Sequence, residues 1–210
     1  MTRSGPPHPG AGGHDSRLSS REELLAACVD RLNSGESCPK GVTSVAWNPN
    51  DLRLASAGGN GTVKVWALGG QRAILTLAGH QKAANSVAWS PDGVRLASGG
   101  VDGTVRIWNT AAGEEKQVLA TPEAVVWCVA WSPDGKKLAA ATDLSVSWKI
   151  WETGTWTETL AWSEYESPLR GLPLHSVAWS PDGRRLASAT LRSVKIWDAP
   201  GYQSAKKQEQ

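Results

Sequence analysis

The 210 residues carry 22 basic and 20 acidic side chains, and a net charge of +2 argues against a nucleic-acid binder or a protein drawn to anionic membranes. Hydrophobic residues make up 40%, with 12 Trp and no Phe, which is enough for one packed domain or one domain with a tail. The three cysteines have no paired spacing, so neither a disulfide framework nor a zinc site is expected. No apolar run approaches the ~20 residues that span a bilayer, and the N-terminus has no apolar signal-peptide core. We expect a cytoplasmic protein without membrane contact.

The N-terminal region divides into two parts. Residues 1–19 are rich in Gly, Pro and Ser, which predicts a disordered tail. Residues 20–40 are predicted to form a short helix and a linker, since Ser20 and Glu23 have the spacing of a capping box. A helix this short is marginal alone, so three interpretations stay open: it packs on the first repeat, it binds a partner, or it is disordered.

One block, residues 86–109, contains the pattern that the rest of the chain repeats. Residues 86–89 alternate small or polar with apolar side chains, as a half-buried strand does. Ser-Pro-Asp-Gly at 90–93 then predicts a tight turn. A second strand at 96–98 and a third at 104–108, joined by a Gly-rich turn, complete a predicted antiparallel meander.

The block recurs four times. Its first Trp is Trp47, Trp89, Trp131 and Trp179, and its last is Trp66, Trp108, Trp151 and Trp197. Successive first Trp residues are 42, 42 and 48 positions apart, and a period of about 40–45 residues is typical of propeller arrays with four strands per unit. The outer, fourth strands are expected at residues 73–78, 117–120 and 156–162.

These residues carry a family resemblance. Val-Ala-Trp-Ser-Pro-Asp-Gly, then Leu-Ala-Ser, then Asp-Gly-Thr-Val-Arg-Ile-Trp resembles the WD-repeat (Trp-Asp repeat) family of β-propellers. The resemblance implies an all-β fold with an array of four blades. The predicted blades cover residues 41–198, at about 41–79, 80–121, 122–163 and 174–198, followed by a frayed tail at 199–210.

The resemblance also implies a hydrogen-bonded chain of His80, Ser98, Asp102 and Trp108 in the second unit. Ser, His and Asp together suggest a hydrolase, but triads are recognised by geometry. These residues recur at structural turns, and the sequence has no nucleophile elbow. We therefore interpret the set as structural and expect no enzymatic activity.

The other units lack parts of this chain. The residues at the position of His80 are Cys38, Pro122 and Arg170. Ala140 replaces the Ser in unit three, and unit four has no Asp in its second turn. We expect unit two to be the most rigid blade.

No cofactor or metal is expected, because the four histidines have no ligand spacing and there is no phosphate-binding loop. The pairs Gly58-Gly59 and Gly99-Gly100 are interpreted as turn glycines with positive φ.

Resemblance to the family further implies recognition through one rim of the propeller. The candidate rim residues are Trp127, His175, Asn85, Thr43, Val101 and Gly59. Trp127 is the most informative, since Trp is enriched at binding hot spots. The alternative for Trp127 is local packing, and for His175 a plain strand position.

The function expected from these features is a scaffold that binds a protein or peptide. The alternative is a regulatory or sensor fragment of a larger ATPase- or kinase-linked WD-repeat protein, and nucleic-acid binding is disfavoured by the charge.

Closure of the array is the last expectation. The family usually has seven blades, the last completed by an N-terminal strand, yet residues 32–36 at that place are not strand-like. We predict an open half-propeller that self-associates, most simply two copies giving eight blades, or a part of a longer propeller. A closed ring of four blades is the less favoured possibility.

Overall fold

The computed structural model describes residues 41–70, 72–122, 124–143, 147–163 and 174–199. All of them belong to one compact unit of the chain. The predicted N-terminal tail and helix, and the C-terminal tail from residue 200, lie outside the described residues. Within the described ranges the secondary structure is entirely β, and no helix there could cross a membrane.

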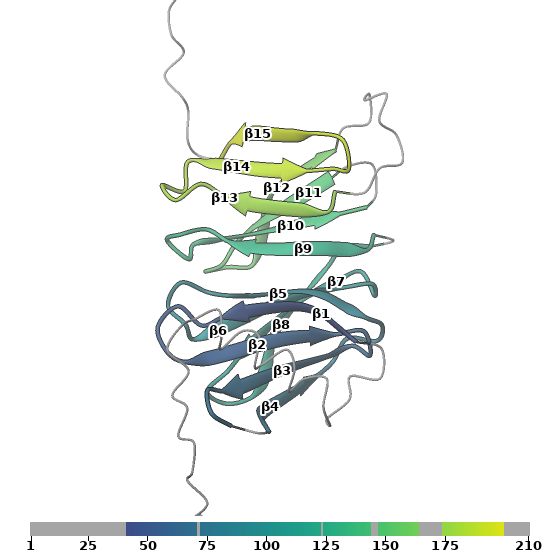
Figure 1. The fold of residues 1–210 in the computed structure, drawn as a ribbon. Helices are drawn as coiled ribbons and strands as arrows, with labels where there is room; N and C mark the ends of the chain where they lie inside the picture. Colours follow the sequence, from purple (N-terminus) through teal and green to yellow (C-terminus); the bar gives the residue numbers. More distant parts are fainter. Residues whose placement is uncertain (1–40, 71, 123, 144–146, 164–173, 200–210) are drawn as a thin grey trace, which may run out of the picture. The chain divides into compact units, whose positions relative to one another are not determined.

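Four antiparallel sheets follow one another along the chain, one for each Trp-bounded repeat, and we call them blades one to four (Figure 1). Blade one contains β1 (Val42–Trp47), β2 (Arg53–Gly58), β3 (Thr62–Ala67) and β4 (Ala73–Ala78). Blade two contains β5 (Ala84–Trp89), β6 (Arg95–Gly100), β7 (Thr104–Asn109) and β8 (Glu114–Ala120). Blade three contains β9 (Val126–Trp131), β10 (Lys137–Thr142), β11 (Ser147–Glu152) and β12 (Thr157–Ser163). Blade four contains β13 (Ser176–Trp179), β14 (Arg185–Ala189) and β15 (Val194–Asp198), with no fourth strand among the described residues. The prediction of an all-β array of four blades is confirmed.

Two outer strands differ from their expected positions. β8 begins at Glu114 instead of residue 117. An exposed outer strand tolerates charged residues, and such residues show no apolar pattern from which a strand could be predicted. β12 begins at Thr157, one residue later than expected. Trp156 has a φ of 57°, which belongs to the turn that precedes the strand.

Consecutive blades pack face to face, and we call each such contact a joint. β5 packs on β1 and β2, β9 packs on β5 and β6, and β13 packs on β9 and β10. The apolar core lies in these joints, because the small and branched residues of one blade meet the first-strand Val and Trp of the next. No extensive contact joins the described strands of blade one to those of blade four. The described blades therefore form an open array.

Candidate functional site

The polar residues of blade two form a continuous hydrogen-bonded chain. The indole N–H of Trp108 donates to Ser98 Oγ at 2.9 Å, and Ser98 Oγ lies 2.8 Å from His80 Nε2. On the other side of the ring, His80 Nδ1 lies 3.0 Å from Asp102 Oδ1. Asp102 lies in the turn that joins β6 to β7, so the chain ties this turn to the sheet.

Two further groups hold Asp102, and the sequence analysis missed both. Thr104 Oγ1 donates to Asp102 Oδ1 at 2.8 Å, and the backbone N–H of Gln81 donates to Oδ2 at 2.9 Å. The signal for the Thr was present, since blade one repeats the arrangement: Thr62 Oγ1 donates to Asn60 Oδ1 at 2.8 Å. An Asp or Asn followed by Gly-Thr therefore marks the motif in both blades.

The electrostatics of the chain favour a neutral His80. Burial lowers the pKa of His80, and the hydrogen bond and charge of Asp102 offset only part of that effect. For Asp102, burial raises the pKa, but hydrogen bonds from Gln81, His80 and Thr104 outweigh it, so the pKa lies below its usual value. A neutral ring that donates from Nδ1 to the carboxylate leaves Nε2 to accept from the Ser98 hydroxyl, so every member is satisfied.

The same Ser, His and Asp geometry would suit a nucleophile, but burial keeps it from substrate. Ser98 has 0% exposed surface, and the His80 side chain is also 0% exposed. Ser98 Oγ already accepts from Trp108. An external substrate therefore has no access to the hydroxyl in this structure.

Gly100 makes room for His80, and Gly99 makes room for the next blade. The expected positive φ was wrong for both glycine pairs, Gly58-Gly59 and Gly99-Gly100. Gly99 and Gly100 lie in β6, and neither is among the residues with positive φ. A Cβ on Gly100 would lie 2.6 Å from His80 Nδ1, and one on Gly99 would lie 2.4 Å from Val126 Cγ1. Close approach of neighbouring groups, not backbone conformation, requires glycine here.

The other blades keep fragments of the chain. Trp66 donates to Ser56 Oγ in blade one, and Trp197 donates to Ser188 Oγ in blade four, both at 2.9 Å. In blade three, Asp143 Oδ1 accepts instead from the backbone N–H of Val125 at 2.8 Å. Blade two alone has the His, Ser, Asp and Trp together in the part of the chain that the structure describes.

The candidate rim residues lie at the end of the blades where the first strands begin. Thr43 Oγ1 donates to the carbonyl of Ala84 at 2.5 Å, and Asn85 Nδ2 donates to the carbonyl of Val126 at 3.1 Å. Each side chain thus reaches the first strand of the next blade. Two further candidates are half-buried beside them, Gly59 after β2 and Val101 after β6.

Trp127 and His175 occupy the corresponding positions in blades three and four and meet each other instead. Their ring centroids lie 5.5 Å apart at an interplanar angle of 64°, an edge-to-face contact. Trp127 keeps 36% of its surface exposed. The rim therefore presents a Trp that is positioned by a neighbouring ring and open to solvent.

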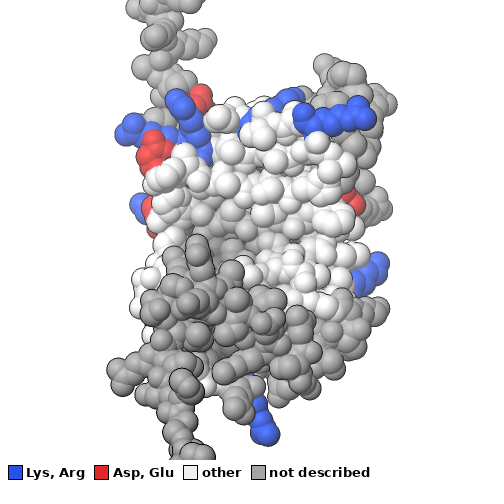
Figure 2. All heavy atoms as spheres, in the orientation of Figure 1, with Lys and Arg blue, Asp and Glu red and all other residues white. Residues whose placement is uncertain are grey.

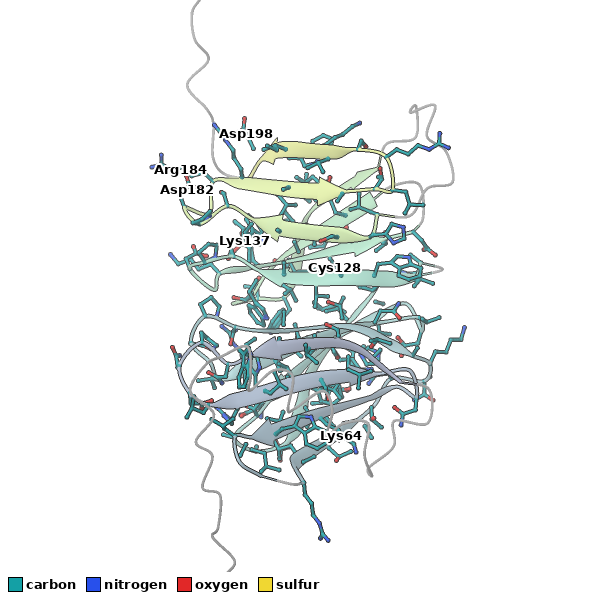
Figure 3. The ribbon with its side chains drawn as sticks, viewed as in Figure 1. Lys64, Cys128, Lys137, Asp182, Arg184 and Asp198 are labelled. Atoms are coloured by element: carbon teal, nitrogen blue, oxygen red, sulfur yellow. The ribbon has the colours of Figure 1, made fainter. Side chains whose placement is uncertain are left out.

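A pocket of about 620 Å³ lies at the opposite end of blades three and four. Lys137, Asp182 and Arg184 line it, and Figure 3 shows them on the same side of the two blades. Lys137 pairs with Glu152 of its own blade. In blade two, the equivalent Arg95 instead lies over the Trp131 ring at 4.8 Å and covers the joint between blades two and three. The lining contains both acidic and basic side chains, so it does not indicate one class of ligand.

The surface over the first strands is uncharged. β1, β5, β9 and β13 contain no Asp, Glu, Lys or Arg. Figure 2 shows a broad uncharged area in the middle of the view, with the charged side chains of the described residues toward its margins. The described ranges hold no cluster of His, Cys, Asp and Glu that could bind a metal ion.

Comparison with known proteins identifies the repeats. Residues 26–67, 71–109, 113–148 and 167–198 match the family model described as WD domain, G-beta repeat. A search of curated proteins gives no match. The matched residues cover well over half of the chain, and they include the first two strands of all four blades. The protein therefore belongs to the WD40 repeat family.

Proposed function

We propose that this protein is a non-enzymatic scaffold that binds a protein or peptide partner through the rim centred on Trp127. WD40 repeats generally mediate interactions between proteins. The observation that carries the proposal is the exposed Trp127 ring held against His175 at the rim. A Trp fixed by its surroundings offers a large apolar face and an N–H donor with little conformational entropy left to lose on binding.

The neighbouring rim residues support a site that is ordered before a partner arrives. Thr43 and Asn85 are held by hydrogen bonds to the following blade, and Val101 and Gly59 lie half-buried beside them. Pre-organised side chains lose less freedom on association, which favours binding.

The chemistry of the surface points to a peptide partner and to no reaction. The uncharged first strands and the net charge of +2 offer little attraction to a nucleic-acid backbone. Ser98, which has a His and an Asp beside it, is fully buried. The free thiol of Cys128 suits a reducing compartment, in keeping with a cytoplasmic scaffold that needs no cofactor.

Selection from a peptide display library, followed by affinity measurement, tests the proposal. We expect Trp127→Ala to lower the affinity for the selected peptides by about tenfold or more, as loss of a hot-spot residue does. Leu160→Ala is the matched control: Leu160 is 38% exposed but lies on the outer strand β12. Both variants should melt like the parent protein. Equal peptide affinity of parent and Trp127→Ala would refute the rim site.

A further inference from the structure

Each joint repeats the same hydrogen bond. The first-strand Trp of one blade donates its indole N–H to the carbonyl of an Ala in the first strand of the blade before it. The bonds are Trp89 to Ala46 at 3.0 Å, Trp131 to Ala88 at 3.1 Å and Trp179 to Ala130 at 3.1 Å. The donor always belongs to the later blade and the acceptor to the earlier one, so a joint has a direction.

Two further contacts recur in the first two joints. The guanidinium of the earlier blade lies over the Trp ring of the later one, Arg53 over Trp89 at 5.0 Å and Arg95 over Trp131 at 4.8 Å. In addition, a Ser hydroxyl of the earlier blade accepts a backbone N–H of the later one. These bonds are Val87 N to Ser44 Oγ at 3.2 Å and Val129 N to Ser86 Oγ at 3.1 Å.

Blade four presents the earlier half of such a joint, and no blade among the described residues packs on it. Val105 and Ile107 of β7 are 0% exposed beneath blade three, but the equivalent Val194 and Ile196 of β15 are 71% and 67% exposed. Arg185, at the position of Arg53 and Arg95, has a side chain that is 66% exposed. The exposed Ala178 and Ser176 of β13 stand where the other blades supply the carbonyl and the hydroxyl acceptor.

Blade one presents the later half. β1 has the sequence Val-Thr-Ser-Val-Ala-Trp, with Trp47 and Val45 at the positions of the donors Trp89 and Val87. Trp47 is half-buried, as Trp179 is in the third joint, and Trp89 and Trp131 are buried at 7% and 8% exposure in the first two. The two ends of the array therefore carry complementary halves of one joint.

We propose that a second copy of this chain occupies the open face of blade four, with its blade one packed there as blade two packs on blade one. Trp47 of the second copy donates to the Ala178 carbonyl, and Arg185 lies over the Trp47 ring. Val194 and Ile196 become buried against β1 of the second copy. The occupant is a copy of the same chain because β1, at its other end, carries the Trp and the Val that supply the donors in the other joints.

Two copies form two such joints at once and close a ring of eight blades. A head-to-tail contact either closes or continues as a filament, and eight blades lie within the range of about 4–8 that propellers use. The second joint forms within one particle, so it adds strength without a further encounter. This pairing uses the blade faces and leaves the rim at Trp127 free.

Light scattering coupled to size exclusion tests the pairing with the full chain. The parent protein should have a molar mass twice the 22.3 kDa of one chain, and Ile196→Glu should have the mass of one chain. Because Ile196 is exposed in the single chain, Ile196→Glu should fold with an unchanged far-ultraviolet spectrum. The control is Val94→Glu: Val94 is 50% exposed in a turn where blades three and four carry Lys136 and Arg184, so this variant should stay dimeric.

Each other outcome overturns the proposal. A parent protein of single mass shows that the faces do not pair. A dimer that persists in Ile196→Glu, or is lost in Val94→Glu, uses another surface. Larger particles that fall to single chains in Ile196→Glu show a head-to-tail joint that does not close with two copies.

Discussion

Blades two and four share one motif but differ in how much of it is buried. Blade two has the complete chain of hydrogen bonds that links Trp108, Ser98, His80 and Asp102, and its β7 lies beneath blade three. Blade four keeps the bond from Trp197 to Ser188, and the face of its β15 is open. The same Val-x-Ile pattern is thus core in one blade and surface in the other. The joint, more than the strand sequence, decides what the apolar residues contribute to stability.

The largest difference in the free energy of unfolding should be between the variants Ile107→Ala and Ile196→Ala. Ile107→Ala removes a fully buried side chain from a joint and should lower the free energy of unfolding by about 2–5 kcal/mol. Ile196→Ala should change it by less than about 0.5 kcal/mol when urea unfolding is measured at concentrations where the chain is single. Similar losses in both variants would show that the two faces do not differ.

A smaller difference in the free energy of unfolding should be between the variants Asp102→Ala and Asp143→Ala. Asp102→Ala leaves a buried His80 nitrogen without its partner and should lower the free energy of unfolding by about 1–3 kcal/mol. Asp143 accepts only the N–H of Val125 among the described residues, so Asp143→Ala should be milder. The same urea experiment measures both, and an equal loss would contradict the view that blade two has the stronger turn.

The smallest effect concerns pH. The pKa of His80 is below 6.5 in the folded chain, so the unfolded chain binds more protons as pH falls below that value. Stability should therefore decline from about pH 7 to 5, well before Asp102 titrates, because its pKa is lowered below 3.8. His80→Gln should flatten this part of the curve. A parent protein equally stable at both pH values would show that folding does not lower the pKa of His80.

The strands were predictable because their signals are local. Alternation, Ser-Pro-Asp-Gly turns and the recurring Trp residues placed the first three strands of each repeat. The outer strand β8 was harder to bound, since Glu114, Glu115 and Lys116 remain exposed at its start and carry no apolar pattern. The Asp102 partners Thr104 and Gln81 were missed because the motif was read as four residues only.

The joints could not be read from the sequence. Thr43 and Asn85 were expected only as rim residues, yet each also donates to a carbonyl 41 positions further along the chain. The acceptors are main-chain atoms, which have no side-chain signature. For the same reason, the exposure of Val194 and Ile196 follows from what packs on them and not from their own pattern.

The indole hydrogen bond across each joint bears on how a chain of this kind can gain or lose whole repeats. Its acceptor is a backbone carbonyl, in Ala46, Ala88 and Ala130 alike, so the bond does not depend on the identity of the acceptor side chain. The indole bond therefore sets no requirement on which residue precedes the Trp in the neighbouring blade. Duplication or loss of a whole repeat leaves this bond possible at the point of fusion, and only the apolar side chains of the joint have to fit anew.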